Sequence, residues 1–96
     1  MRPIGQIINL FPKTPVAVWK WEIKELCPFE DCTIMPRVSD NGQTRWVVDT
    51  HLGEENLYEG AYIVRKGAGA YFVMNLNQIS TEFTLISEVN ANVLSF

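Results

Sequence analysis

Two apolar runs on either side of a glycine loop constrain the fold of this chain more than any other feature. Residues 61–66 and 70–74 are rich in aromatic and β-branched side chains, and they flank Gly67-Ala68-Gly69. Side chains of these types favour strands, and glycine supplies the positive φ that a tight hairpin turn requires. The stretch therefore predicts a β-hairpin on which the rest of the chain is built.

The first strand before this hairpin is expected over residues 15–21. Val16 and Val18 share one face of that strand by the period of two, and Trp19 and Trp21 share the other. Because both faces are apolar, this pattern is typical of a strand that is covered on both sides.

A second hairpin is predicted around Asn41-Gly42, one of the strongest short turn signals. Residues 33–38 form its first strand, which Pro36 restricts to the edge of a sheet because proline has no N–H to donate. Residues 43–50 form the return strand, with one packed face and one wet face. The wet face carries Arg45, Val47 and Asp49.

Two short helical segments are expected. Residues 22–26 are good helix formers, but Pro28 limits them to one or two turns. Residues 75–80 predict one helical turn with Asn75 or Asn77 as its N-cap.

The remaining segments are expected to be peripheral. Residues 51–59 predict a polar connection, and residues 81–86 predict the last strand. Residues 1–12, with a proline near each end, predict an arm or an edge strand. Residues 87–96 end on an apolar side chain and predict either a final edge strand or a tail that is used in association.

Together these elements predict a single domain over residues 1–96, because 96 residues match one compact unit. The expected fold class is α+β: a curved antiparallel sheet of five or six strands with one or two short helices. Closure of that sheet into a barrel is left open. A core of this size is small, so association into a homo-oligomer would add stability.

Charge and hydropathy argue against several classes of function. The net charge is −3, and the eight basic residues are scattered, whereas direct binding of nucleic acid needs clustered Lys and Arg. No apolar run reaches the length of about 18 residues that a membrane span requires, so no membrane contact is expected. Residues 1–12 hold one basic residue and a broken apolar run, which is a poor signal peptide. We therefore expect a cytoplasmic protein.

Two cysteines and one histidine are the candidates for metal or redox chemistry. Cys27 and Cys32 are separated by four residues, a gap that a disulfide or two metal ligands can close. Zinc would need two more ligands, and His51 is the one histidine. The favoured interpretation is two reduced thiols in a cytoplasmic protein, with no metal and no cofactor.

About half of the chain resembles a set of small phage and prophage proteins. Those proteins share a Pro-Val-x-Val strand and a Gly-Asp-aromatic-Ile-Ile hairpin. The corresponding segments here are 15–21, 48–54, 60–67, 69–72, 77–79 and 82–83. Ala61 stands where that family has aspartate, and Ala70 where it has glutamate. The resemblance implies a phage-encoded protein that acts in the cytoplasm of a bacterial host.

Aromatic side chains close to cations are the candidate binding residues, because both types are frequent at binding hot spots. The candidates are Trp46, Tyr62, Tyr71, Arg45, Arg65 and Lys66. No catalytic residue is assigned.

Three functions are considered, in order of preference. The first is a non-enzymatic, phage-encoded binding protein that inhibits a bacterial host protein, in particular a component of an immune system. The second is a homo-oligomeric sponge that sequesters a signalling nucleotide in an aromatic and basic pocket. The third is a small hydrolase that uses His51 with Asp49 as its orienting partner.

Overall fold

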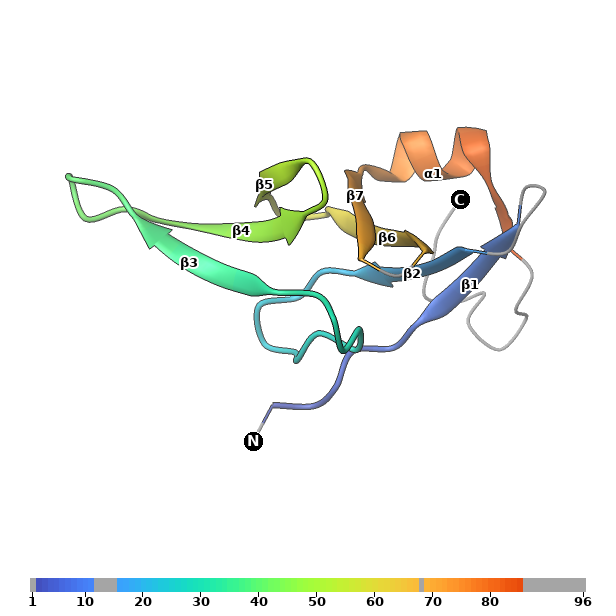
Figure 1. Cartoon of the computed structure of the whole chain (residues 1–96), viewed down its shortest axis with the longest axis horizontal. Helices are drawn as coiled ribbons and strands as arrows, with labels where there is room; N and C mark the ends of the chain where they lie inside the picture. The colour runs from blue at the N-terminus through green and yellow to red at the C-terminus, as the bar shows by residue number, and fades with distance from the viewer. Residues whose placement is uncertain (1, 12–15, 68, 86–96) are drawn as a thin grey trace.

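Within residues 2–11, 16–67 and 69–85, which the computed structural model describes, eight strands form two antiparallel sheets beside one helix (Figure 1). The larger sheet has the order β7-β6-β2-β1-β8 and consists of β7 (Ala70–Met74), β6 (Tyr62–Gly67), β2 (Val16–Lys20), β1 (Ile8–Phe11) and β8 (Thr84–Leu85). The smaller sheet has the order β3-β4-β5 and consists of β3 (Ile34–Val38), β4 (Thr44–Thr50) and β5 (Gly53–Leu57). Helix α1 (Leu76–Glu82) follows β7.

The fold class is confirmed in part. Antiparallel pairing and a short helix are present, but the structure is mostly β and has two sheets instead of one. The sheets have five and three strands, or four and three when the two-residue strand β8 is left out. The described residues form no closed barrel, because the larger sheet ends at β7 on one side and β8 on the other. The chain divides because residues 21–33 leave the larger sheet before β3 begins.

The predicted hairpin over residues 61–74 is confirmed as β6 and β7. Tyr62 pairs with Met74, and a bulge between Arg65 and Gly67 precedes the turn. Gly69 has a φ of +73°, the conformation for which glycine is favoured. Strand β6 also pairs with β2 on its other side, so it lies inside the sheet.

Both faces of the larger sheet are buried, as the pattern of residues 15–21 predicts. Val18 on β2 belongs to an apolar cluster that includes Ile79 of α1. Trp19, its neighbour in sequence, points to the opposite face and belongs to a second cluster with Val48 of β4. The helix therefore covers one face, and the smaller sheet covers the other.

Helix α1 is longer than predicted. Asn75 is its N-cap: the Asn75 side chain accepts from the N–H of Gln78 at 2.9 Å, and the Gln78 side chain accepts from the N–H of Asn75 at 2.8 Å. This capping box satisfies two backbone donors at the helix start. The helix continues to Glu82, so the strand predicted over residues 81–86 is reduced to β8.

The helix predicted over residues 22–26 is wrong, because this segment forms a turn. The N–H of Leu26 donates to the carbonyl of Pro3 at 2.8 Å, and the Leu26 carbonyl accepts from the N–H of Gly5 at 2.8 Å. Pairing with the N-terminal segment takes the backbone groups that a helix would use.

The expectation that residues 1–12 form an arm or an edge strand is also corrected. Strand β1 lies between β2 and β8 and is paired on both sides. Pro3 falls outside the strand, so it removes no hydrogen bond from the ladder, and Pro12 lies outside the described residues.

The polar connection predicted over residues 51–59 contains strand β5. Its sequence, Gly-Glu-Glu-Asn-Leu, holds few strand-favouring residues, yet it pairs with β4 from Thr50↔Gly53 to Trp46↔Leu57. The Thr50 hydroxyl donates to the Gly53 carbonyl at 2.7 Å and accepts from the N–H of Leu52. These bonds form a tight turn that sets the register of β5.

The wet face predicted for β4 is wrong at one position. Val47 is 1% exposed, although Arg45 and Asp49 on the same face are exposed. Arg37 of β3 lies opposite Arg45, and Glu54 of β5 lies opposite Asp49. An ion pair joins Arg37 to Glu54, so these two side chains meet above β4 between Arg45 and Asp49. The pair therefore passes over Val47 and shields it from water. The predicted tail, residues 87–96, lies outside the described residues.

We predict that Gly5→Ala destabilises the fold and that Gly67→Ala does not. A Cβ atom at Gly5 would lie 2.6 Å from Cε2 of the buried Trp19, whereas one at Gly67 would meet no atom within 4 Å. Overpacking of this kind costs about 1–3 kcal/mol, which lowers the melting temperature of a domain of this size by roughly 10 °C. Thermal unfolding followed by circular dichroism measures both variants. Equal melting temperatures would show that the indole does not pack on this backbone.

Candidate functional site

An open groove of about 680 Å³ lies where the end of β2 meets the smaller sheet, and we call it the Trp46 groove. Its walls combine apolar, basic and acidic side chains. They are Lys20, Trp21, Glu22, Ile23, Thr44, Arg45, Trp46, Leu57, Tyr58, Glu59 and Gly60.

The two indoles of the groove are held by the core. Trp46 lies opposite Leu57 on the paired strands β4 and β5, and it packs on the second apolar cluster. Trp21 follows β2 directly, and its backbone N–H donates to the carbonyl of Ala61 at 3.0 Å. Both residues are half-buried, so each ring is fixed on its inner side and open on its outer side.

Exposed apolar side chains stand at the rim of the groove. Ile23 is 52% exposed and Tyr58 is 46% exposed. Arg45 lies beside them and donates a hydrogen bond to Oδ1 of Asn56 at 2.8 Å. A surface of this composition offers dispersion contacts and charge side by side.

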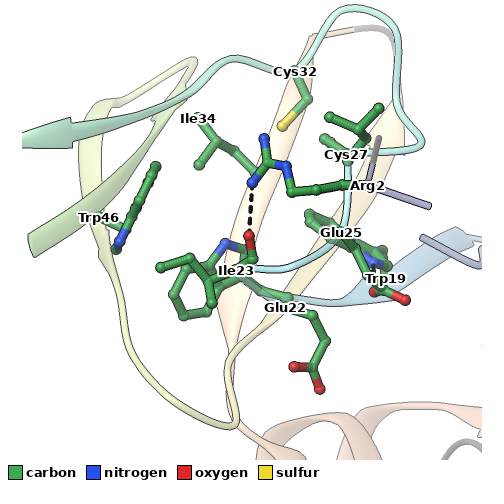
Figure 2. Close-up of a pocket in the computed structure, with 11 residues that line it drawn as sticks. Arg2, Trp19, Glu22, Ile23, Glu25, Cys27, Cys32, Ile34 and Trp46 are labelled. Atoms are coloured by element: carbon green, nitrogen blue, oxygen red, sulfur yellow. Dashed lines mark hydrogen bonds between the residues drawn. The ribbon is translucent and has the colours of Figure 1, made fainter. Parts of the chain in front are cut away.

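A second, smaller pocket of about 190 Å³ adjoins the groove (Figure 2). We call it the thiol pocket, because Cys27 and Cys32 line it. It shares Trp21 and Trp46 with the groove. Figure 2 shows the side chain of Arg2 reaching across this pocket, where its Nη1 donates to the carbonyl of Ile23 at 2.6 Å.

Asp31 holds the loop between β2 and β3 against the β6–β7 hairpin. Its carboxylate accepts from the N–H of Gly69 at 2.9 Å and from the hydroxyl of Tyr71, and Nε of Arg65 lies 3.7 Å away. We call these four residues the Asp31 clamp. The hydrogen bond from Tyr71, followed by the Gly69 N–H and the Arg65 charge, lowers the pKa of Asp31. Burial and the neighbouring carboxylate raise the pKa of Tyr71.

The three aromatic candidates do not share a site. Trp46 lies in the groove with the candidate Arg45. Tyr62 is 3% exposed in the first apolar cluster, and Tyr71 is 2% exposed in the second. Packing therefore accounts for both tyrosines, and their ring faces are not open to a ligand.

The other two basic candidates also lie apart from the groove. Arg65 belongs to the Asp31 clamp. Nζ of Lys66 lies 4.7 Å from the centre of the Phe72 ring and 5.8 Å from that of Phe83. These cation–π distances indicate that Lys66 covers the aromatic edge of the first cluster.

His51 stands in the exposed turn between β4 and β5. Its ring meets Phe72 edge-on, with 5.1 Å between the ring centres. Asp49, its predicted orienting partner, is exposed, and the backbone N–H of Asp49 donates to the carbonyl of Thr33 at 2.9 Å. This geometry gives the imidazole a packing role, and the hydrolase stays a prediction.

Several residues of these sites were missed by sequence reasoning. Ile23 was assigned to a helix, so its exposure at the groove was not foreseen. Tyr58 was assigned to a polar connection. The strand that precedes it, β5, contains two glutamates and buries Leu57 at its end, so its sequence is only a weak signal of a strand. No local pattern relates Asp31 to Gly69, because the contact spans 38 residues.

We predict that Asp31→Asn flattens the acid dependence of stability. A carboxylate whose folded pKa is lowered stabilises the protein above its unfolded pKa of about 3.9, and this contribution is lost as the pH falls through the folded value. Urea unfolding at a series of pH values measures the slope below about pH 4. Glu30→Gln, which removes a charge from the same loop without changing the clamp, is the control. An equal slope in Asp31→Asn and in the unmodified chain would contradict the clamp.

No family model matches the chain, no curated protein matches its sequence, and no solved structure matches its fold. Among the described residues, no group of three or more His, Cys, Asp or Glu side chains is arranged to hold a metal ion. In the same part of the chain, none of the helical structure is long and apolar enough to cross a membrane.

Proposed function

We propose that this chain is a phage-encoded, non-enzymatic binding protein that blocks a bacterial host protein through the Trp46 groove. The observation that carries the proposal is the pair of fixed, half-buried indoles beside exposed Ile23 and Tyr58. The resemblance to small phage proteins supplies the setting, the bacterial cytoplasm. A component of a host immune system is the class of target that this setting favours.

Rigid aromatic side chains suit this role. Trp and Tyr bury a large area at a low cost in conformational entropy. Binding hot spots cluster where such side chains are surrounded by polar groups. Here the core already holds Trp21 and Trp46 in place, so little ordering is needed on binding.

The charges at the groove favour a protein over a nucleotide. Lys20 and Arg45 are matched by Glu22 and Glu59 along the same walls. A phosphate group would meet both signs of charge and would be repelled by the carboxylates, whereas a protein surface can offer complementary pairs to both. Because the groove carries both signs of charge, we rank the nucleotide sponge second. Two indoles beside two cations are nevertheless what such a sponge would use.

The β3–β4 hairpin supplies a second surface. Figure 1 shows it projecting away from the larger sheet. Strand β3 is the outer strand of its sheet, and Val38 near the tip is 69% exposed. A partner, or a second copy in a homo-oligomer, would meet this edge next to the groove, while Pro36 limits the backbone pairing it can offer.

We predict that Ile23→Asp weakens binding of the host partner by at least roughly 30-fold, the effect of losing a hot spot worth about 2 kcal/mol. Leu52→Asp is the matched control, because Leu52 is an equally apolar residue, 74% exposed, in the turn between β4 and β5. The tagged chain and both variants are used to capture protein from bacterial lysate, and mass spectrometry compares what each retains. The affinity for the protein recovered is then measured by calorimetry.

A protein that is captured by the unmodified chain and by Leu52→Asp, but not by Ile23→Asp, would support the groove as the binding surface. Equal capture by all three chains would contradict it. Circular dichroism of each variant checks that the fold is retained.

We also predict that cyclic mononucleotides and dinucleotides leave the melting temperature unchanged. A ligand present at 100 times its dissociation constant stabilises the folded state by about 2.7 kcal/mol, which raises the melting temperature by roughly 10 °C in a domain of this size. A shift of that size, lost in a Trp46→Leu variant that remains folded, would favour the sponge over the blocker.

A further inference from the structure

The two cysteines form a paired site at the thiol pocket. Both thiols are free and half-buried, and both line the pocket wall (Figure 2). The pocket gives a small molecule access to sulfur atoms that would otherwise lie within the second apolar cluster, where both residues pack.

The loop between the thiols is anchored at two points. Phe29 is 6% exposed, and its ring centre lies 5.5 Å from that of Tyr71. Asp31 is held by the Asp31 clamp, and the N–H of Cys32 donates to the carbonyl of Phe29 at 3.4 Å. These contacts restrain the loop that separates the two cysteines, and both cysteines line the same pocket.

The two thiols are chemically unequal. The Cys27 sulfur accepts hydrogen bonds from the Cys32 thiol and from the backbone N–H of Phe29, which lowers the pKa of Cys27. The shared hydrogen bond and burial raise the pKa of Cys32, to which the carboxylates of Asp31 and Asp49 also contribute. Of the two thiols, Cys27 is therefore the one that loses its proton more readily.

We propose that Cys27 and Cys32 are a thiol–disulfide exchange site that takes small-molecule disulfides of the glutathione type. Cys27 is the attacking thiolate, and Cys32 is the resolving thiol. The site closes to an intramolecular disulfide and is opened again by excess small-molecule thiol.

The exchange balances in two steps. The Cys27 thiolate attacks one sulfur of the disulfide, a bond forms between them, the S–S bond of the reagent breaks, and one thiolate leaves. Cys32 then loses its proton to solvent and attacks the Cys27 sulfur, which expels the second half of the reagent as thiolate. The two cysteines are oxidised by two electrons, and the reagent is reduced to two thiols.

A metal site fits these residues less well. Tetrahedral zinc needs four ligands, and no group of three or more His, Cys, Asp or Glu side chains is arranged to bind a metal among the residues that the structure describes. A dithiol needs no ligand beyond the pair itself.

The test exposes the full-length chain to oxidised glutathione without oxygen, quenches it with N-ethylmaleimide, and measures the intact mass. We expect the unmodified chain to lose two hydrogen atoms and to carry neither glutathione nor maleimide. Cys32→Ser should accumulate one glutathione, because the resolving thiol is missing. Cys27→Ser should react more slowly than Cys32→Ser, because burial and the carboxylates of Asp31 and Asp49 still raise the pKa of the remaining thiol, Cys32.

Three results would overturn the proposal: two maleimides on the unmodified chain after exposure, a stable glutathione adduct on it, or equal rates for the two serine variants. Limited alkylation of the unmodified chain with iodoacetamide, mapped by peptide mass, gives a readout that needs no variant. Alkylation of Cys27 ahead of Cys32 supports the assignment, and equal or reversed labelling overturns it.

Discussion

Strand β6 is the element on which the rest of the structure depends, because it is apolar on both faces. Ile63 and Val64 are neighbours in sequence, point to opposite sides of the larger sheet, and are both 0% exposed. Each buried side chain of this kind contributes about 1.5–3 kcal/mol, but only if both faces are covered. The chain meets this need with α1 and its cap on one side and the smaller sheet on the other. A single sheet of five or six strands would leave one face in water.

The candidate site lies at the junction where the smaller sheet covers one face of the larger sheet. No strand of the smaller sheet pairs with a strand of the larger sheet in the described part of the chain, so side chains alone join the two. Backbone ladders hold neighbouring strands about 5 Å apart, whereas packed sheets stand about 10 Å apart and separate further at their margins. Trp21 and Trp46 are large enough to span such a margin. The Trp46 groove is the part of that junction that they do not fill.

Local patterns in the sequence predicted the parts of this fold that local forces determine. The β6–β7 hairpin, the Asn41-Gly42 turn and the Asn75 cap each depend on residues close together in the chain, and all three are present. The predictions were wrong where residues distant in sequence form hydrogen bonds with the backbone of the segment. Residues 22–26 have helical propensity, but hydrogen bonds to Pro3 and Gly5 outweigh it.

Strand β5 is the opposite case, in which distant contacts create an element that the local sequence does not predict. Its residues do not favour a strand, and pairing along its whole length with Trp46 to Thr50 of β4 imposes one. The candidate site was predicted only in part for this reason. Trp46 and Arg45 were identified by residue type, whereas Ile23 and Tyr58 joined them through segments whose structure was set by remote contacts.

The connection over residues 21–33 links the two surfaces to which function is assigned. It begins at Trp21 in the groove, passes Ile23 at the rim, and carries both thiols before it enters β3. Its far end is tied to the β6–β7 hairpin through Asp31, and its middle is tied to the N-terminal segment through Leu26. A segment without regular structure can hold fixed side chains only when it is restrained in this way at several points. The same restraints position Trp21 at the groove and place Cys27 and Cys32 on the wall of one pocket.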